Sequence, residues 1–141
     1  MNARAHTCED LRDLAEQATG QAYAPYSRLH VGAALRSVSG WTYTGSNVEN
    51  AAFPIGMCAE RAAIAAAVQA EGSHFRLEAI AVAAVSAKDG DLLPITPCGA
   101  CRQAIVEFGP DALVSFRTPE GAWLEISADS LLPYRFSFPQ A

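Results

Sequence analysis

The sequence predicts an α/β protein with one mixed sheet of about five strands and helices on its faces. The chain of 141 residues is long enough for one domain. It is 50% hydrophobic and 18% charged, which suits a packed core better than disorder. Helical and strand-like segments alternate in the order α-β-β-α-β-α-β-β, followed by a short terminal helix. Since neither a repeat nor a linker interrupts this order, we expect residues 1–141 to form a single domain.

The first half of the chain predicts one helix, a pair of strands and a loop. Residues 10–22 place apolar side chains on one face and predict an amphipathic helix. Pro25 cannot continue that helix, so a turn should follow it. Residues 29–36 and 41–45 predict two strands joined by a hairpin turn. Residues 47–57 predict a loop.

The second half predicts a buried strand between two helices. Residues 58–71 are rich in alanine and predict a helix, for which Gly72 supplies the end. Residues 77–85 are apolar on both faces, as in a central strand covered from both sides. After a loop over residues 88–97, a second helix is expected at 98–108. The last expected elements are strands at 113–117 and 123–126 and a short helix or turn at 130–133.

The charge and hydropathy of the chain argue against two classes of partner. The formal net charge is −5, whereas nucleic-acid binding relies on clustered Lys and Arg. No uncharged apolar run approaches the roughly 20 residues that cross a membrane. The N-terminus lacks the apolar region of a secretion signal. We therefore expect a cytoplasmic protein with reduced thiols and with neither nucleic acid nor membrane as partner.

Three of the four cysteines fall in two short motifs that predict a zinc site. Cys98 and Cys101 are three residues apart, so one helix turn would carry both sulfurs on one face. Cys58 stands at the start of the other long helix. If the two helix starts converge, three thiolates hold one Zn²⁺ and leave its fourth position open, as in catalytic zinc sites. A water in that position would have its pKa lowered toward about 7.

Two charged residues follow Cys58 within one helical turn. Glu60 is expected to be the catalytic proton shuttle beside the zinc water and not a metal ligand. Arg61 is expected to lie behind the ligands, where its charge offsets part of the excess negative charge of three thiolates.

Three other interpretations of these residues stay open at this stage. Cys98 and Cys101 could form a redox pair. Cys8 could complete a closed, four-cysteine structural zinc site. Glu60 and Arg61 could be ordinary solvated residues of a first helical turn.

The two motifs resemble those of the short, three-cysteine, zinc-dependent cytidine deaminases, which have a Cys-x-Glu motif followed by Pro-Cys-x-x-Cys. Further blocks match in the family's order over roughly residues 8–138. These blocks are Ala22–Ser27, Val31–Ala34, Asn47–Ala52, Cys98–Gln103 and Leu131–Pro133. The resemblance implies a three-layer α-β-α fold. It also implies hydrolysis of cytidine and deoxycytidine to uridine and deoxyuridine in pyrimidine salvage.

The resemblance also implies contacts to the substrate. It assigns Asn47 and Glu49 to the ribose, and their amide and carboxylate can exchange hydrogen bonds with sugar hydroxyls. Without the resemblance, Asn47 would be interpreted as a residue that serves the turn. The backbone N–H of Ala59 would bind the base carbonyl.

Two positions depart from the family pattern, and a third implies an oligomer. Leu29 stands where many relatives have Phe, so an aromatic wall becomes aliphatic. Phe53 stands where relatives often have Tyr, so a hydroxyl is missing. Phe136 matches an aromatic that stacks on the base from a neighbouring subunit, which implies a homotetramer with shared sites. From packing alone, Phe136 would be interpreted as a core residue.

Other functions stay possible on the sequence alone. The same zinc chemistry could act on a modified or antibiotic aminopyrimidine nucleoside. A polynucleotide-editing deaminase is disfavoured, because the acidic chain shows no basic strip for a strand. A binding module with structural zinc gives no reason for Glu60 beside Cys58.

Overall fold

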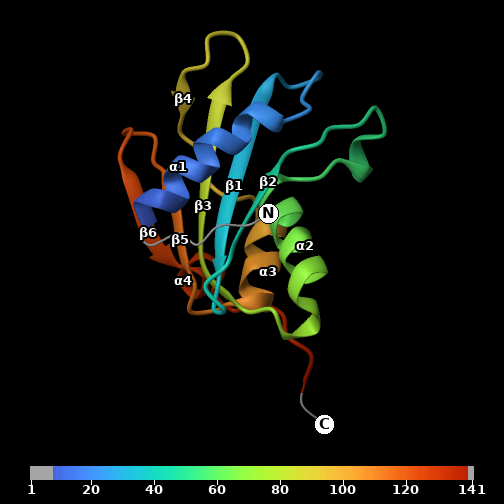
Figure 1. Ribbon diagram of the computed structural model, residues 1–141, viewed down its shortest axis with the longest axis vertical. Helices are drawn as coiled ribbons and strands as arrows, with labels where there is room; N and C mark the ends of the chain where they lie inside the picture. The colour runs from blue at the N-terminus through green and yellow to red at the C-terminus, as the bar shows by residue number, and fades with distance from the viewer. Residues whose placement is uncertain (1–7, 140–141) are drawn as a thin grey trace.

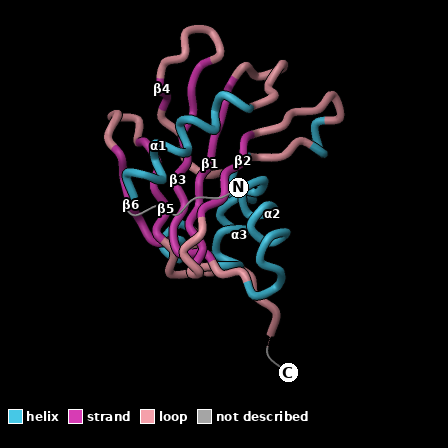
Figure 2. Tube along the Cα trace, viewed as in Figure 1, coloured by secondary structure: helices cyan, strands magenta, loops and turns pink. Residues whose placement is uncertain are grey.

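The computed structural model describes residues 8–139, except for the side chain of Cys8. Six strands form one sheet in the order β2-β1-β3-β5-β6, and β4 pairs with β3 off this path (Figures 1 and 2). The strands are β1 Leu29–Ser37, β2 Thr42–Ser46, β3 Leu77–Ser86, β4 Leu92–Leu93, β5 Leu113–Arg117 and β6 Trp123–Ser127.

The sheet is mixed, as the sequence predicts. β3 runs parallel to β5, while the β1–β2, β1–β3, β3–β4 and β5–β6 pairs are antiparallel. The strand beyond the expected five is β4, which pairs Leu92 and Leu93 with Val85 and Ala84. Two residues are too few to display the alternation by which a strand is recognised.

Helices cover both faces of the sheet and produce the expected three layers (Figure 1). They are α1 Cys8–Ala18, α2 Ala59–Glu71, α3 Gly99–Phe108 and α4 Ala128–Leu131. Ala34 packs in the cluster under α1, whereas Ala33 and Leu35 pack in the cluster with α2 and α3. This alternation follows from the two-residue repeat of a strand. Within residues 8–139, no helix combines the length and apolar content needed to cross a membrane.

Two glycines allow helices to lie directly on the sheet. A Cβ at Gly32 would fall 2.1 Å from the carbonyl oxygen of Ala15 in α1. A Cβ at Gly45 would fall 2.4 Å from the nitrogen of Ala63 and 2.6 Å from the oxygen of Ala59. Gly45 therefore seats the first turns of α2 on β2, next to Cys58.

The element boundaries differ from the expected ones mainly at helix ends. α1 stops at Ala18 and continues as a short 3₁₀ helix, Thr19–Gln21, in which the Thr19 hydroxyl donates to the Glu16 carbonyl at 2.6 Å. Cys58 and Cys98 are N-cap residues with extended backbone, so α2 and α3 begin one residue later than predicted. α4 starts earlier than the expected 130–133, because Ser127 caps it by accepting from the Ser130 N–H.

Candidate active site

The starts of α2 and α3 meet, and this brings three cysteine sulfurs together. Cys58 and Cys98 are the two N-caps, and Cys101 lies in the first turn of α3. All three are free thiols, and their Sγ atoms lie within 4.8 Å of one another. The Cys58–Cys98 Sγ distance is 4.0 Å. Tetrahedral zinc with Zn–S bonds of about 2.3 Å separates its sulfurs by roughly 3.8 Å, so this donor set fits the ion.

The pKa values of the Cys58 and Cys101 thiols are shifted in opposite directions. A hydrogen bond from Cys101 is the largest cause that lowers the pKa of Cys58 to about 5, and Arg61 and Cys98 add to it against the effect of burial. The same hydrogen bond, together with burial, raises the pKa of Cys101. Cys58 is thus the thiolate of the pair. Arg61 places Nη2 3.8 Å from the Cys58 Sγ, and this bond raises the pKa of Arg61.

Glu60 occupies the first turn of α2 and is only 4% exposed. Burial is the main cause that raises its pKa; its own backbone N–H opposes this, and the neighbouring charge of Cys58 reinforces it. Such a carboxyl holds a proton more readily than one in water. Its burial rules out the interpretation of Glu60 as a solvated helix residue.

A cavity of about 370 Å³ lies against the sulfur cluster. It contains eight of the predicted site residues, together with six that the sequence did not single out. Its lining is Leu29, Val31, Asn47, Val48, Glu49, Phe53, Gly56, Met57, Cys58, Ala59, Glu60, Ile95, Thr96 and Cys98. Met57, Ile95 and Thr96 directly precede the cysteine motifs. Their position in the sequence could therefore have identified them as cavity residues.

Asn47 ties the cavity wall to β1. Its Oδ1 accepts from the Val31 N–H at 2.8 Å, and its Nδ2 donates to the Leu29 carbonyl at 2.9 Å. The side chain is 9% exposed, so these bonds satisfy a nearly buried amide. One hydrogen of Nδ2 and one lone pair of Oδ1 remain for a ligand. The interpretation of Asn47 as a structural residue and its assignment to the ribose are therefore compatible.

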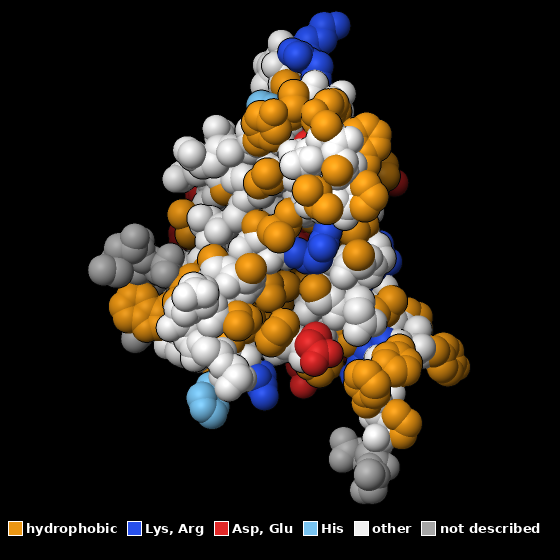
Figure 3. All heavy atoms as spheres, turned by 90° about the vertical axis from the view of Figure 1, so that its right-hand side faces the viewer, with side chains coloured by type: hydrophobic (Ala, Val, Ile, Leu, Met, Phe, Trp, Pro, Cys, Tyr) orange, Lys and Arg blue, Asp and Glu red, His pale blue; other side chains and the backbone are white. Residues whose placement is uncertain are grey.

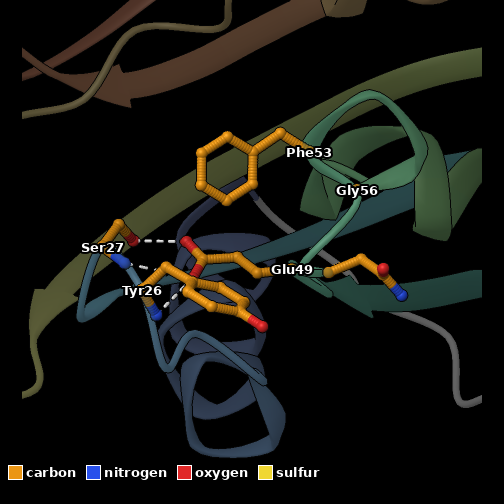
Figure 4. A pocket seen from close by; sticks show the side chains of 6 residues that line it. Tyr26, Ser27, Glu49, Phe53 and Gly56 are labelled. Carbon is orange, nitrogen blue, oxygen red and sulfur yellow. Dashed lines mark hydrogen bonds between the residues drawn. The ribbon is translucent and has the colours of Figure 1, made fainter.

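A second hollow, of about 430 Å³, is shown in Figure 4. Its lining shares Glu49, Phe53 and Gly56 with the first cavity. Tyr26 and Ser27 form its other side. The Phe53 ring stands edge-on to Tyr26, with 5.7 Å between ring centroids, and is 73% exposed. Phe53 therefore marks the boundary between the two hollows.

Phe136 does not reach the cavity within a single chain. It is 66% exposed, and its ring contacts Phe138, with 5.2 Å between centroids. The segment after α4 extends away from the sheet beyond the far end of α2 (Figure 1). The interpretation of Phe136 as a core residue is therefore wrong, and its assignment to a neighbour's site stays a prediction.

The expectation about Cys8 falls on a side chain outside the described residues. Its backbone begins α1, on the sheet face opposite α2 and α3. The described cysteine sulfurs form a group of three.

Comparison with known proteins gives consistent results. The family described as the cytidine and deoxycytidylate deaminase zinc-binding region matches residues 6–117. A cytidine deaminase of Sporosarcina psychrophila is 41% identical over 123 residues, 86% of this chain and 85% of that protein. The crystal structure of cytidine deaminase from Burkholderia pseudomallei superposes with a TM-score of 0.80 at 40% identity, covering 93% of this chain and 100% of that one. A blasticidin-S deaminase of Bacillus cereus is 27% identical, over 89% of this chain and 91% of that protein.

Proposed function

The chain belongs to the zinc-dependent cytidine deaminase family, which consists of hydrolases, and we propose that it converts free cytidine and deoxycytidine into uridine and deoxyuridine with release of ammonia. One observation carries this proposal: three thiols and a buried carboxyl converge on one wall of a cavity of about 370 Å³. That volume suits a small ligand.

Cys58, Cys98 and Cys101 would hold the zinc, which supplies an activated water as nucleophile near neutral pH when bound. Three thiolates carry more negative charge than one Zn²⁺ neutralises. Arg61 beside Cys58 and the N-termini of α2 and α3 offset part of that excess.

Glu60 would carry the proton between steps. Its carboxylate takes a proton from the attacking water and delivers it to the ring nitrogen N3 of the pyrimidine, which makes the amino-bearing carbon electrophilic. It then takes the remaining proton from the hydroxyl group that has added to this carbon and transfers it to the departing amino nitrogen, so that ammonia leaves and the carbonyl of uridine forms. The raised pKa that burial gives Glu60 suits a group that must hold a proton between accepting and donating it.

The base would lie at the start of α2. The first N–H groups of a helix have no partner within the helix, so the Ala59 N–H is available to the base carbonyl. Leu29 would supply an aliphatic wall, and Phe53 would lie at the rim.

The sugar would lie against Asn47 and Glu49, which line the same cavity. The free hydrogen of Asn47 Nδ2 can be donated to a hydroxyl whose own proton goes to Glu49. One hydroxyl suffices for both bonds, so both ribose and deoxyribose are accommodated.

The charges of the cavity favour a nucleoside over a nucleotide. Glu49 and Glu60 line it, whereas Lys and Arg are absent from the described lining. A phosphate would meet carboxylates without a compensating cation. The same argument disfavours a nucleic-acid strand.

A homotetramer with shared sites is part of the proposal. Exposed apolar side chains gather on the loop that borders both hollows, and Figure 3 shows hydrophobic side chains on this face. They include Val48, Phe53, Ile55 and Met57. An exposed apolar patch of this kind is typical of an interface. Phe136 would then enter the site of a neighbouring subunit. The proposed role of this enzyme is the salvage of pyrimidines in the cytoplasm.

A modified or antibiotic aminopyrimidine nucleoside is the second candidate substrate. It draws support from the similarity to a blasticidin-S deaminase and from Leu29 and Phe53, where this chain departs from the family pattern. The lower identity of that relative, 27% against 41%, places it second.

The test incubates the purified zinc-loaded protein with cytidine, deoxycytidine, cytidine monophosphate and blasticidin S, and follows ultraviolet absorbance and ammonia. We expect turnover of the first two, its loss with a zinc chelator and its return with added zinc. Absence of ammonia from both nucleosides at full zinc content would refute the proposal. Exclusive turnover of blasticidin S would favour the second candidate.

A further inference from the structure

The carboxylate of Glu49 is held by the segment that precedes β1. Its Oε1 accepts from the backbone N–H groups of Tyr26 at 2.9 Å and Ser27 at 3.1 Å, and its Oε2 accepts from the Ser27 hydroxyl (Figure 4). The Ser27 hydroxyl is the largest cause that lowers the pKa of Glu49. Glu49 is therefore fixed in place and stays an anion.

The Ser27 hydroxyl has a defined direction. Its oxygen accepts from the Leu29 N–H at 3.1 Å, so its single proton is left for Glu49. Arg28, between the two, has a φ of 59°, in the left-handed region. Its N–H donates to the Ala24 carbonyl at 3.1 Å, and its carbonyl accepts from the Ala87 N–H at 3.0 Å. These bonds hold the turn that carries Ser27.

The hydrogen bonds leave Glu49 little spare capacity. A carboxylate has about four acceptor positions, two on each oxygen. Among residues 8–139, the three donors named above occupy both positions on Oε1 and one on Oε2. One position on Oε2 remains. Glu49 also lines the cavity that contains Cys58 and Glu60.

We propose that Ser27 is a positioning residue for substrate: it aims Glu49 so that the one free position of Oε2 accepts from a single sugar hydroxyl. The proposal rests on the proposed nucleoside deaminase function. Ser27 acts through Glu49 and not on the base, so its effect requires a sugar that carries the matching hydroxyl.

The test measures kcat/KM of the zinc-loaded protein and its Ser27→Ala variant on cytidine, deoxycytidine and 2′,3′-dideoxycytidine. We expect Ser27→Ala to lower kcat/KM for cytidine and deoxycytidine about tenfold, mainly through KM, since hydrogen bonds to charged groups have effects of this order. Cytidine and deoxycytidine share the 3′-hydroxyl, and dideoxycytidine lacks it, so we assign the matching hydroxyl to the 3′ position. For dideoxycytidine the variant and the wild type should agree within about twofold. Ser27→Thr keeps the hydroxyl and should restore most of the lost kcat/KM.

Ser39 offers a matched control, because its hydroxyl also donates to a carboxylate, that of Glu71, at 2.9 Å and away from the cavity. Ser39→Ala should lower kcat/KM for none of the three nucleosides. If Ser27→Ala does not fold, Ser27→Cys replaces the donor by a weak one at similar size, and the same pattern is expected.

Two results distinguish the failures. If the wild-type protein deaminates the nucleosides and Ser27→Ala loses activity equally on all three, or on none, the inference about Ser27 is wrong and the proposed function stands. If the wild-type protein with full zinc content deaminates none of them, the proposed function fails and the inference fails with it.

Discussion

Helix α2 carries a glutamate at each end, and the two carboxyl groups have opposite surroundings. Glu60 lies in the first turn, nearly buried, beside Cys58 and facing a cavity. Glu71 lies in the last turn and accepts from the hydroxyls of Ser37 at 2.8 Å, Ser39 at 2.9 Å and Tyr43 at 2.7 Å.

The same factors act on both pKa values with different outcomes. Burial is the largest influence on each carboxyl and acts to raise its pKa. At Glu71 the three hydroxyl donors outweigh burial, and the pKa is lowered. At Glu60 burial prevails, and the pKa is raised.

The two ends of α2 thus separate stability from chemistry. The hydroxyl donors around Glu71 fix it as an anion and tie the end of α2 to the β1–β2 hairpin. Glu60 lies beside thiols and an open cavity, so its carboxyl can exchange protons with a bound ligand. The direction of a carboxyl's pKa shift thus depends on its hydrogen-bond donors and not on its burial alone.

The largest expected effect concerns the ligands beside Glu60. Cys101→Ala removes the buried sulfur of the trio, and we expect it to lose zinc and to reduce deamination to background, because two thiolates hold the ion poorly. Zinc content per chain and turnover check this. A folded variant with one zinc per chain would show that the ligand set is wrong.

Glu60→Gln keeps the size of the side chain and removes its proton transfer. We expect zinc to be retained and kcat to fall by about 10²–10⁴-fold, the usual contribution of a general acid–base group. Metal analysis and steady-state kinetics measure both. Wild-type kcat in this variant would remove Glu60 from the mechanism.

Glu71→Gln makes the same change at the other end of α2. We expect a loss of about 1–3 kcal/mol in the free energy of unfolding, because three hydroxyl donors lose an anionic acceptor. The kcat should stay within about twofold of wild type, since Glu71 lies outside the cavity lining. Urea denaturation measures the unfolding free energy, and steady-state kinetics measures kcat. A larger loss of kcat in Glu71→Gln than in Glu60→Gln would contradict the assignment of stability to Glu71 and of chemistry to Glu60.

The smallest effect is the pH dependence of the Tyr43–Glu71 bond. Burial, followed by the bond and charge of Glu71, raises the pKa of Tyr43 from 10.0 to about 12. A raised folded-state pKa means that the stabilisation is complete below pH 10 and is lost as the pH rises from 10 to about 12. The difference in unfolding free energy between wild type and Tyr43→Phe should therefore shrink over this range. A difference that grows with pH would contradict the assignment.

The sequence predicted the site better than its surroundings, for identifiable reasons. The cysteine motifs and Glu60 are close in sequence, so short-range spacing suffices to place them on two helix starts. The convergence of those starts depends on long-range packing, such as the contact of α2 with Gly45, which spacing cannot reveal.

The residues that the sequence did not reveal act through distant partners. The tie between Ser27 and Glu49 spans a separation of 22 residues, and that between Ser37 and Glu71 one of 34. Serines and glutamates are ordinary surface residues by composition, so only the structure identifies these pairs. Strand β4 and the end of α1 were misjudged because short elements and helix ends have weak local signals.

In the proposed site, three sulfurs hold a zinc ion and leave one position open beside Glu60. X-ray absorption at the zinc edge of the purified protein tests this arrangement most directly. We expect three sulfur ligands at about 2.3 Å and one oxygen or nitrogen ligand. Four sulfur ligands, which would enclose the ion and bring in Cys8, would contradict it.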